Sequence, residues 1–209
     1  MKKSLMLVFL LIIPFVVFSK TIHIASNLVR PEEKEIFYEG EVIVEIEEDN
    51  LRLSTDSMVV RKIKGSWREI EATGTVVVEL EYGIATSTYL KYDITDGVGK
   101  MVNNVKISFI DKKSSDTVYI DCDEMSFNLK EEKFEGFSEG TVVINKGSME
   151  MHARKFEYDR KNGIMILKGD VFIKDSEKDF KMWAEEAKVF TEKNEAVALK
   201  VKMVIEVEE

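Results

Sequence analysis

The feature that most constrains this chain is a short strand-like pattern that returns several times. "GEVIVEIEE" (residues 40–48) is echoed by "GTVVVELEY" (74–82), "GTVVINKGS" (140–148) and "GDVFIKDSE" (169–177). After each glycine, apolar residues alternate with polar or charged residues, which is the period of a β-strand that buries one face. The recurrence predicts a chain built from repeated strands.

The repeat has two parts. The first part is marked by a glycine or its equivalent, and the markers are Gly40, Gly74, Asn103, Gly140, Gly169 and Val201. The second part is a small residue with apolar residues three and five positions later, and its copies are "TDSMVV", "STYLKY", "CDEMSF", "ARKFEY" and "AEEAKV". A unit of roughly 30 residues cannot bury its apolar face alone, so successive units must stack against one another.

Short polar turns between the patterns indicate how the strands connect. Turn sequences such as "ITDG" and "RKNG" suit hairpins and therefore antiparallel pairing, which favours a jelly roll over a β-solenoid. From Ile22 onward no window shows the apolar spacing of an amphipathic helix. We expect an all-β fold, an elongated antiparallel β-jelly roll of about 15 strands, as a single domain over residues 20–209.

The first nineteen residues have a different character. Lys2 and Lys3 precede an apolar run over residues 5–18, and Ser19 suits the last position before a cleavage site. This pattern predicts a signal peptide over residues 1–19, in helical form, and export to the periplasm. The alternative is an uncleaved anchor in the inner membrane that faces the periplasm, but the run contains Pro14 and is shorter than the roughly 20 residues that span a bilayer.

Composition excludes several classes of partner and bond. The net charge of −9 argues against nucleic acid, because phosphate binding needs a cationic face. Cys122 is the single cysteine, so an intramolecular disulfide is impossible. Its distance from the signal also excludes lipid attachment at a new N-terminal cysteine.

No residue pattern predicts catalysis, a cofactor or a metal. Neither His23 nor His152 has another histidine or a cysteine at ligand spacing, so both are predicted to face solvent on strands. The run "DCDE" (residues 121–124) lacks the central glycine and alternating ligands of a calcium loop, and Cys122 takes the place of a small inward residue. Motifs such as GxSxG and HExxH are also missing. We expect a protein that is not an enzyme.

The inward positions of the strands leave two possibilities open. They could form a closed core, or they could line a long apolar groove whose flexible methionines adapt to a chain-like ligand. The candidate groove residues are Val42, Val44, Met58, Val76, Val78, Leu90, Val105, Ile107, Phe109, Met125, Phe127, Val142, Ile144, Met151, Phe156, Val171, Ile173 and Met182.

One stretch carries a family resemblance. The segment "ARKFEYDRKNGIMILKGDVFI" (residues 153–173) resembles the OstA-like repeat of the periplasmic lipopolysaccharide-transport proteins of the LptA type. The matching positions are Tyr38, Gly40, Val42, Val44, Ala153, Phe156, Tyr158, Gly163, Leu167, Gly169, Val171 and Ile173. The resemblance implies a jelly roll, open along one side, whose interior shields the acyl chains of lipopolysaccharide on the way from the inner to the outer membrane.

The resemblance also implies partners. These are lipopolysaccharide or another acylated envelope lipid, related jelly-roll proteins of the same machinery, and further copies joined head to tail through the terminal strands over residues 21–26 and 201–209. Two alternatives remain: a membrane-anchored jelly roll of the LptC type, and a structural β-repeat protein without a ligand. The third repeat, "NNVKISF", departs from the family pattern because it lacks the glycine.

Overall fold

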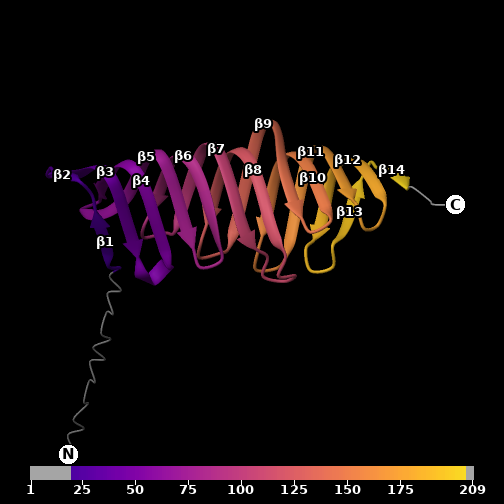
Figure 1. The fold of residues 1–209 in the computed structure, drawn as a ribbon, viewed down its shortest axis with the longest axis horizontal. Coiled ribbons are helices and arrows are strands. Elements are labelled where there is room, and N and C mark those ends of the chain that lie inside the picture. Colours follow the sequence, from indigo (N-terminus) through magenta and orange to yellow (C-terminus); the bar gives the residue numbers. More distant parts are fainter. Residues whose placement is uncertain (1–19, 206–209) are drawn as a thin grey trace, which may run out of the picture.

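Strands that run across a long axis make up almost all of the structure (Figure 1). The computed structural model describes residues 20–205, and within them the strands form one 14-stranded sheet. The only helix in this part of the chain is a 3₁₀ turn at Glu47–Asp49. The predicted signal helix and the terminal acids after Ile205 lie outside the described residues.

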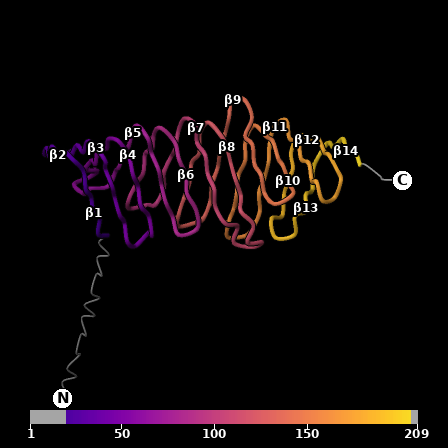
Figure 2. The backbone as a smooth tube through the Cα atoms, viewed as in Figure 1, coloured from indigo at the N-terminus to yellow at the C-terminus, as the bar shows by residue number. Residues whose placement is uncertain are grey.

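The sheet is an antiparallel meander. From β3 to β13 each strand pairs with the next one along the chain, and Figure 2 follows the resulting hairpins from one end of the molecule to the other. The strands are β1 (Ile22–Ala25), β2 (Leu28–Pro31), β3 (Glu35–Ile46), β4 (Leu51–Ile63), β5 (Ser66–Leu80), β6 (Gly83–Asp93), β7 (Val98–Ile110), β8 (Thr117–Asn128), β9 (Lys133–Lys146), β10 (Met149–Asp159), β11 (Ile164–Asp175), β12 (Phe180–Phe190), β13 (Glu195–Leu199) and β14 (Lys202–Ile205). The all-β jelly roll predicted from the repeats is confirmed.

Five of the six repeated markers lie at β-bulges in the middle of long strands, whereas Val201 lies between β13 and β14. Strand pairing breaks between Glu39 and Val42 on β3, and Gly40 in this gap has φ 75°. In the third repeat Asn103 takes the place of the glycine and adopts the same left-handed backbone, with φ 65°. Asparagine tolerates this conformation better than most residues, so the repeat keeps its bulge without a glycine. Each bulge bends its strand.

The bends divide the sheet into two walls. The first wall consists of residues 43–46 of β3 and the half-strands that pair with them, one after another, across the sheet. It ends in β1 at one edge and β14 at the other. The second wall contains the half-strands in line with residues 36–39, and it ends in β2 and β13. Phe109 of the first wall stacks on Tyr158 of the second wall, with ring centroids 5.4 Å apart, so the inner faces of the walls meet.

Alternating burial follows the alternating sequence. Val42, Val44 and Ile46 are fully buried, whereas Glu45 between them is exposed. The same alternation continues through β12, so the inner faces of both walls join in one hydrophobic core.

The two ends of the roll are built differently from its middle. At the first end β1 and β2 share β3 as their neighbour, and at the last end β13 and β14 share β12. Met203 and Ile205 on β14 follow the same alternation as the inward residues of the other strands, but they are 49% and 62% exposed. Both side chains still point to the inner face of the sheet, because Met203 pairs with Met182 and Ile205 pairs with Phe180 on β12. Within the described residues, no further strand or wall covers them.

Candidate functional site

The predicted groove residues come together in the interior between the walls. Every one of them is at most 8% exposed, from Val42 on β3 to Met182 on β12. In this structure they pack against one another as a continuous apolar core. Their contact with a lipid stays a prediction.

A narrow cavity lies between the walls. It is lined by Val78, Leu80 and Tyr82 on the first wall and by Met125 and Leu129 on the second, among other apolar residues. Its volume is about 30 Å³, which is room for roughly one water molecule, and its lining exposes no polar surface. An acyl chain can therefore enter the interior only if the walls part.

The walls meet at a mouth, which we define as the line between the turns of the first wall and the turns of the second. One contact across it, here called the first clasp, joins Tyr92 to Asp49. The hydroxyl of Tyr92 donates a hydrogen bond to Asp49 Oδ2 at 3.0 Å. Lys20 Nζ donates to Asp49 Oδ1 at 2.7 Å and to the carbonyl of Ile94 at 2.9 Å. Burial, together with the Asp49 carboxylate, raises the pKa of Tyr92, which keeps its phenol protonated as a donor.

A second clasp joins Tyr158 to Asp111. The Tyr158 hydroxyl donates to Asp111 Oδ2, while the backbone N–H groups of Lys113 and Ser114 each donate to Asp111 Oδ1 at 2.8 Å. Burial alone would raise the pKa of Asp111, but these hydrogen bonds outweigh it and hold the pKa below its usual value. Asp111 is 1% exposed and is therefore a buried carboxylate satisfied from both walls.

Charged residues support the second clasp. The guanidinium of Arg160 lies 3.9 Å from the ring centroid of Tyr82 and donates to the carbonyl of Ile110 at 3.2 Å. Arg160 also pairs with Glu132 at 2.9 Å, and Lys112 pairs with the same carboxylate at 2.7 Å. These contacts link turns of both walls around Asp111.

Further along the mouth, Lys146 closes the gap. Its side chain is fully buried at an inward position of β9, where its ammonium group donates to Asp116 at 2.7 Å and to the side chain of Asn194. Asp116 belongs to a turn of the first wall and Asn194 to a turn of the second. The sequence pattern gave no reason to expect a buried lysine here.

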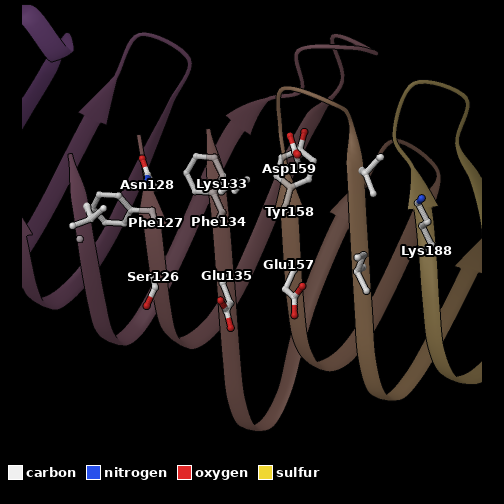
Figure 3. Close-up of a pocket in the computed structure, with 14 residues that line it drawn as sticks. Ser126, Phe127, Asn128, Lys133, Phe134, Glu135, Glu157, Tyr158, Asp159 and Lys188 are labelled. Carbon is white, nitrogen blue, oxygen red and sulfur yellow. The ribbon is translucent and has the colours of Figure 1, made fainter. Parts of the chain in front are cut away.

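The depression in Figure 3 lies on the outer face of the second wall. Glu135 and Glu157 lie side by side on neighbouring strands, below the rings of Phe134 and Tyr158 (Figure 3). Lys168 on the adjacent strand β11 forms an ion pair with Glu157 at 2.9 Å. This surface carries ion pairs, but apolar side chains such as Ile164 and Ile166 also line it, beside the buried rings of Phe134 and Tyr158.

The other residues weighed from sequence lie apart from the mouth. His23 is exposed, and His152 packs its ring against Phe172 on the outer face, with ring centroids 5.5 Å apart. Cys122 is buried, and burial raises the pKa of its thiol to about 12. Across residues 20–205, no three His, Cys, Asp or Glu side chains are placed to hold a metal ion. No helix in the same range is long and apolar enough to cross a membrane.

The clasp residues were not among the functional residues predicted from the sequence. Tyr92 and Tyr158 occupy the same position of the repeat, five residues after Ser87 and Ala153, and were taken there only as apolar. The signal that could have indicated them is that tyrosine recurs at this inward position. Tyrosine adds a hydroxyl there, whereas the other copies of the repeat have valine or phenylalanine. The carboxylates that accept from them lie in turns of varied length, where no pattern marks them.

Comparison with known proteins gives one clear result. The sequence profile of the family described as "LptA/(LptD N-terminal domain) LPS transport protein" matches residues 23–133, more than half of the chain. Among solved structures, the chain is similar to LptH from Pseudomonas aeruginosa, described as the LptA homologous periplasmic component of the conserved lipopolysaccharide transport device. The two share 8% sequence identity over 90% of this chain and 96% of that chain, with a TM-score of 0.27. No curated protein sequence matches the chain significantly.

Proposed function

This chain belongs to the LptA and LptD N-terminal domain family of lipopolysaccharide transport proteins, and from this premise we propose that it shields the acyl chains of lipopolysaccharide between its two walls. It acts in the periplasm as a carrier or bridge from the inner to the outer membrane. If the envelope lacks conventional lipopolysaccharide, another acylated amphiphile takes its place. The chain itself performs no reaction.

The observation that carries this proposal is the length of the apolar interior. Inward residues of both walls form one cluster from β3 to β12, without a break along the roll. Burying a methylene is worth about 0.8 kcal/mol, so a fully sheathed chain of about twelve carbons gains up to roughly 10 kcal/mol over water. Met58, Met125, Met151 and Met182 supply flexible side chains that can move aside for such a chain.

Site-specific photo-crosslinking tests the proposal. A photoreactive residue at Met125, which faces the interior, is compared with one at the neighbouring exposed residue Ser126. After incubation with purified lipopolysaccharide, we expect crosslinks at position 125 and few at 126. Equal labelling at the two positions, or no labelling at any inward position, would contradict shielding in the interior.

The ends of the roll support a second part of the proposal, head-to-tail association with further copies or with related jelly rolls. β1 and β2 leave one edge of the sheet unpaired, and β13 and β14 leave the other. Both edges carry exposed apolar residues, including Leu28 at 54% and Leu199 at 64%. An unpaired edge with apolar side chains is a ready template for strand addition.

The closed interior favours one alternative, a structural envelope protein without a ligand. The cavity of about 30 Å³ holds no lipid as it stands. Lipid extraction and native mass spectrometry of the protein purified from its own envelope separate the two functions. A bound acylated lipid supports the carrier, whereas lipid-free protein that also rejects added lipopolysaccharide supports the structural role.

A further inference from the structure

The contacts across the mouth differ in kind along its length. Tyr92 with Asp49 and Tyr158 with Asp111 join the walls by hydrogen bonds at two places. Between these two clasps lies a stretch that we call the seam, formed by Leu80 and Tyr82 on the first wall and Leu129 on the second. The seam residues are half-buried and pack against the core.

We propose that the seam is the portal through which an acyl chain enters the interior, and that the two clasps hold the walls together on either side of it. This inference rests on the proposed function, because it specifies where the lipid-binding interior opens. The ligand class is a linear saturated acyl chain attached to a polar head that stays outside.

The chemistry of the seam suits this role. The cavity directly behind Leu80 and Leu129 has no polar lining, so a chain that enters there leaves no buried polar group without a partner. Opening the seam breaks apolar contacts and the cation–π contact of Arg160 with Tyr82, and the methylenes of the incoming chain replace the apolar ones. Elsewhere along the mouth, opening would strip hydrogen bonds from buried groups such as Asp111, which is far more costly.

The geometry of the clasps suits a holding role. Each tyrosine lies near the free end of a second-wall half-strand, and each aspartate lies in or next to a turn of the first wall. At each flank the tyrosine hydrogen bond acts together with a cationic side chain that also crosses the mouth, Lys20 at the first clasp and Arg160 at the second, and these contacts limit how far the walls separate. The two tyrosines recur at equivalent positions of the repeat, and each donates its hydroxyl to an aspartate of the first wall, so both flanks of the seam carry the same kind of contact.

Removal of the two hydroxyls tests the restraint. In the Y92F/Y158F variant each ring keeps its packing, because Tyr92 stacks on Phe127 and Tyr158 stacks on Phe109. The probe is a fatty acid that carries an environment-sensitive fluorophore, and its uptake is followed by stopped-flow fluorescence. We expect the association rate to rise several-fold relative to the wild type.

A charge in the seam tests the portal itself. L129E places a carboxylate where the chain would pass, and we expect the association rate to fall several-fold. Tyr119→Glu is the matched control, because Tyr119 is 55% exposed on the outer face and its charge should leave the rate unchanged. Thermal unfolding of each variant checks that the fold is intact.

A second measurement does not depend on rates. A photoreactive residue at Leu129 should be labelled by the fatty acid at times when Met125, deeper in the interior, is still unlabelled. Rates that do not respond to Y92F/Y158F or to L129E, or simultaneous labelling at both positions, would overturn the portal while the proposed function stands. A wild-type protein that takes up neither fatty acid nor lipopolysaccharide would overturn the proposed function and the portal with it.

Discussion

The middle of the roll and its C-terminal end carry the same alternating pattern but differ in burial. Met58 on β4 is 2% exposed, whereas Met203 on β14 is 49% exposed, although both occupy inward positions. In the middle, a half-strand has a neighbour on each side and a wall opposite, whereas β14 pairs only with β12. The comparison teaches that alternation decides which way a side chain points, and that neighbouring strands decide whether it is buried.

The sharpest test of this comparison truncates one apolar side chain in each region. Phe156 is fully buried, so Phe156→Ala should lower the free energy of unfolding by about 3–5 kcal/mol through lost burial and a new cavity. Met203→Ala at the open end should stay within about 0.5 kcal/mol of the wild type. Urea denaturation followed by circular dichroism measures both. Equal losses would mean that the end is packed as tightly as the middle.

Two glycines in the middle extend the comparison to the shape of the interior. A Cβ at Gly136 would collide with the ring of Phe156, whereas a Cβ at Gly140 would meet nothing within 4 Å. Gly136→Ala should therefore cost about 1–3 kcal/mol from overpacking. Gly140→Ala should be nearly neutral, although Gly140 is a marker of the repeat. A large loss at Gly140 would show that its role is something other than space or backbone freedom.

The second clasp gives a pH-dependent prediction for the middle of the roll. The pKa of Asp111 is lower in the folded protein than in the unfolded chain, so the folded state binds fewer protons at this group. The stability it contributes is complete above the unfolded pKa of about 4 and is lost as the pH falls through the folded value. Unfolding free energies measured between neutral and acidic pH should decrease accordingly.

Tyr158→Phe is the control for this titration. It removes the Tyr158 hydrogen bond that helps to lower the pKa of Asp111, so the variant should lose less stability than the wild type over the same acidic range. Other carboxylates with lowered pKa, such as Glu132 and Asp116, titrate in both proteins and cancel in the difference. Identical pH profiles would mean that the clasp does not couple to folding.

Sequence alone predicted the fold because the information for it is local. The direction of Val42 and the bulge at Gly40 follow from alternation and from backbone preference. The clasps could not be predicted, since Asp111 and Tyr158 are 47 residues apart in the sequence and meet only when the folded sheet brings the two walls face to face. The closure of the interior over Met125 was equally hidden, because a pattern fixes the inner face of each wall but not the distance between walls.

The smallest expected effect on stability comes from the outward side of the last strands. Val197 and Leu199 on β13 are 62% and 64% exposed, so V197K/L199K should change the free energy of unfolding by no more than about 0.5 kcal/mol. The same substitutions should weaken self-association, because lysine on an edge strand disfavours addition of another strand. Sedimentation velocity over a range of concentrations measures this, with Tyr119→Lys in the middle of the roll as the control of similar exposure.

The outcome bears on the difference between the two regions. If copies join head to tail, strands of the next copy cover the end, and its apolar side chains gain the neighbours that Met58 already has. In that case the end of the roll has the same structure as the middle and lacks only the neighbouring strands, which the next copy supplies. A wild type that stays monomeric at every concentration and binds no related jelly roll, or a lysine variant that associates as the wild type does, would contradict this role of the end.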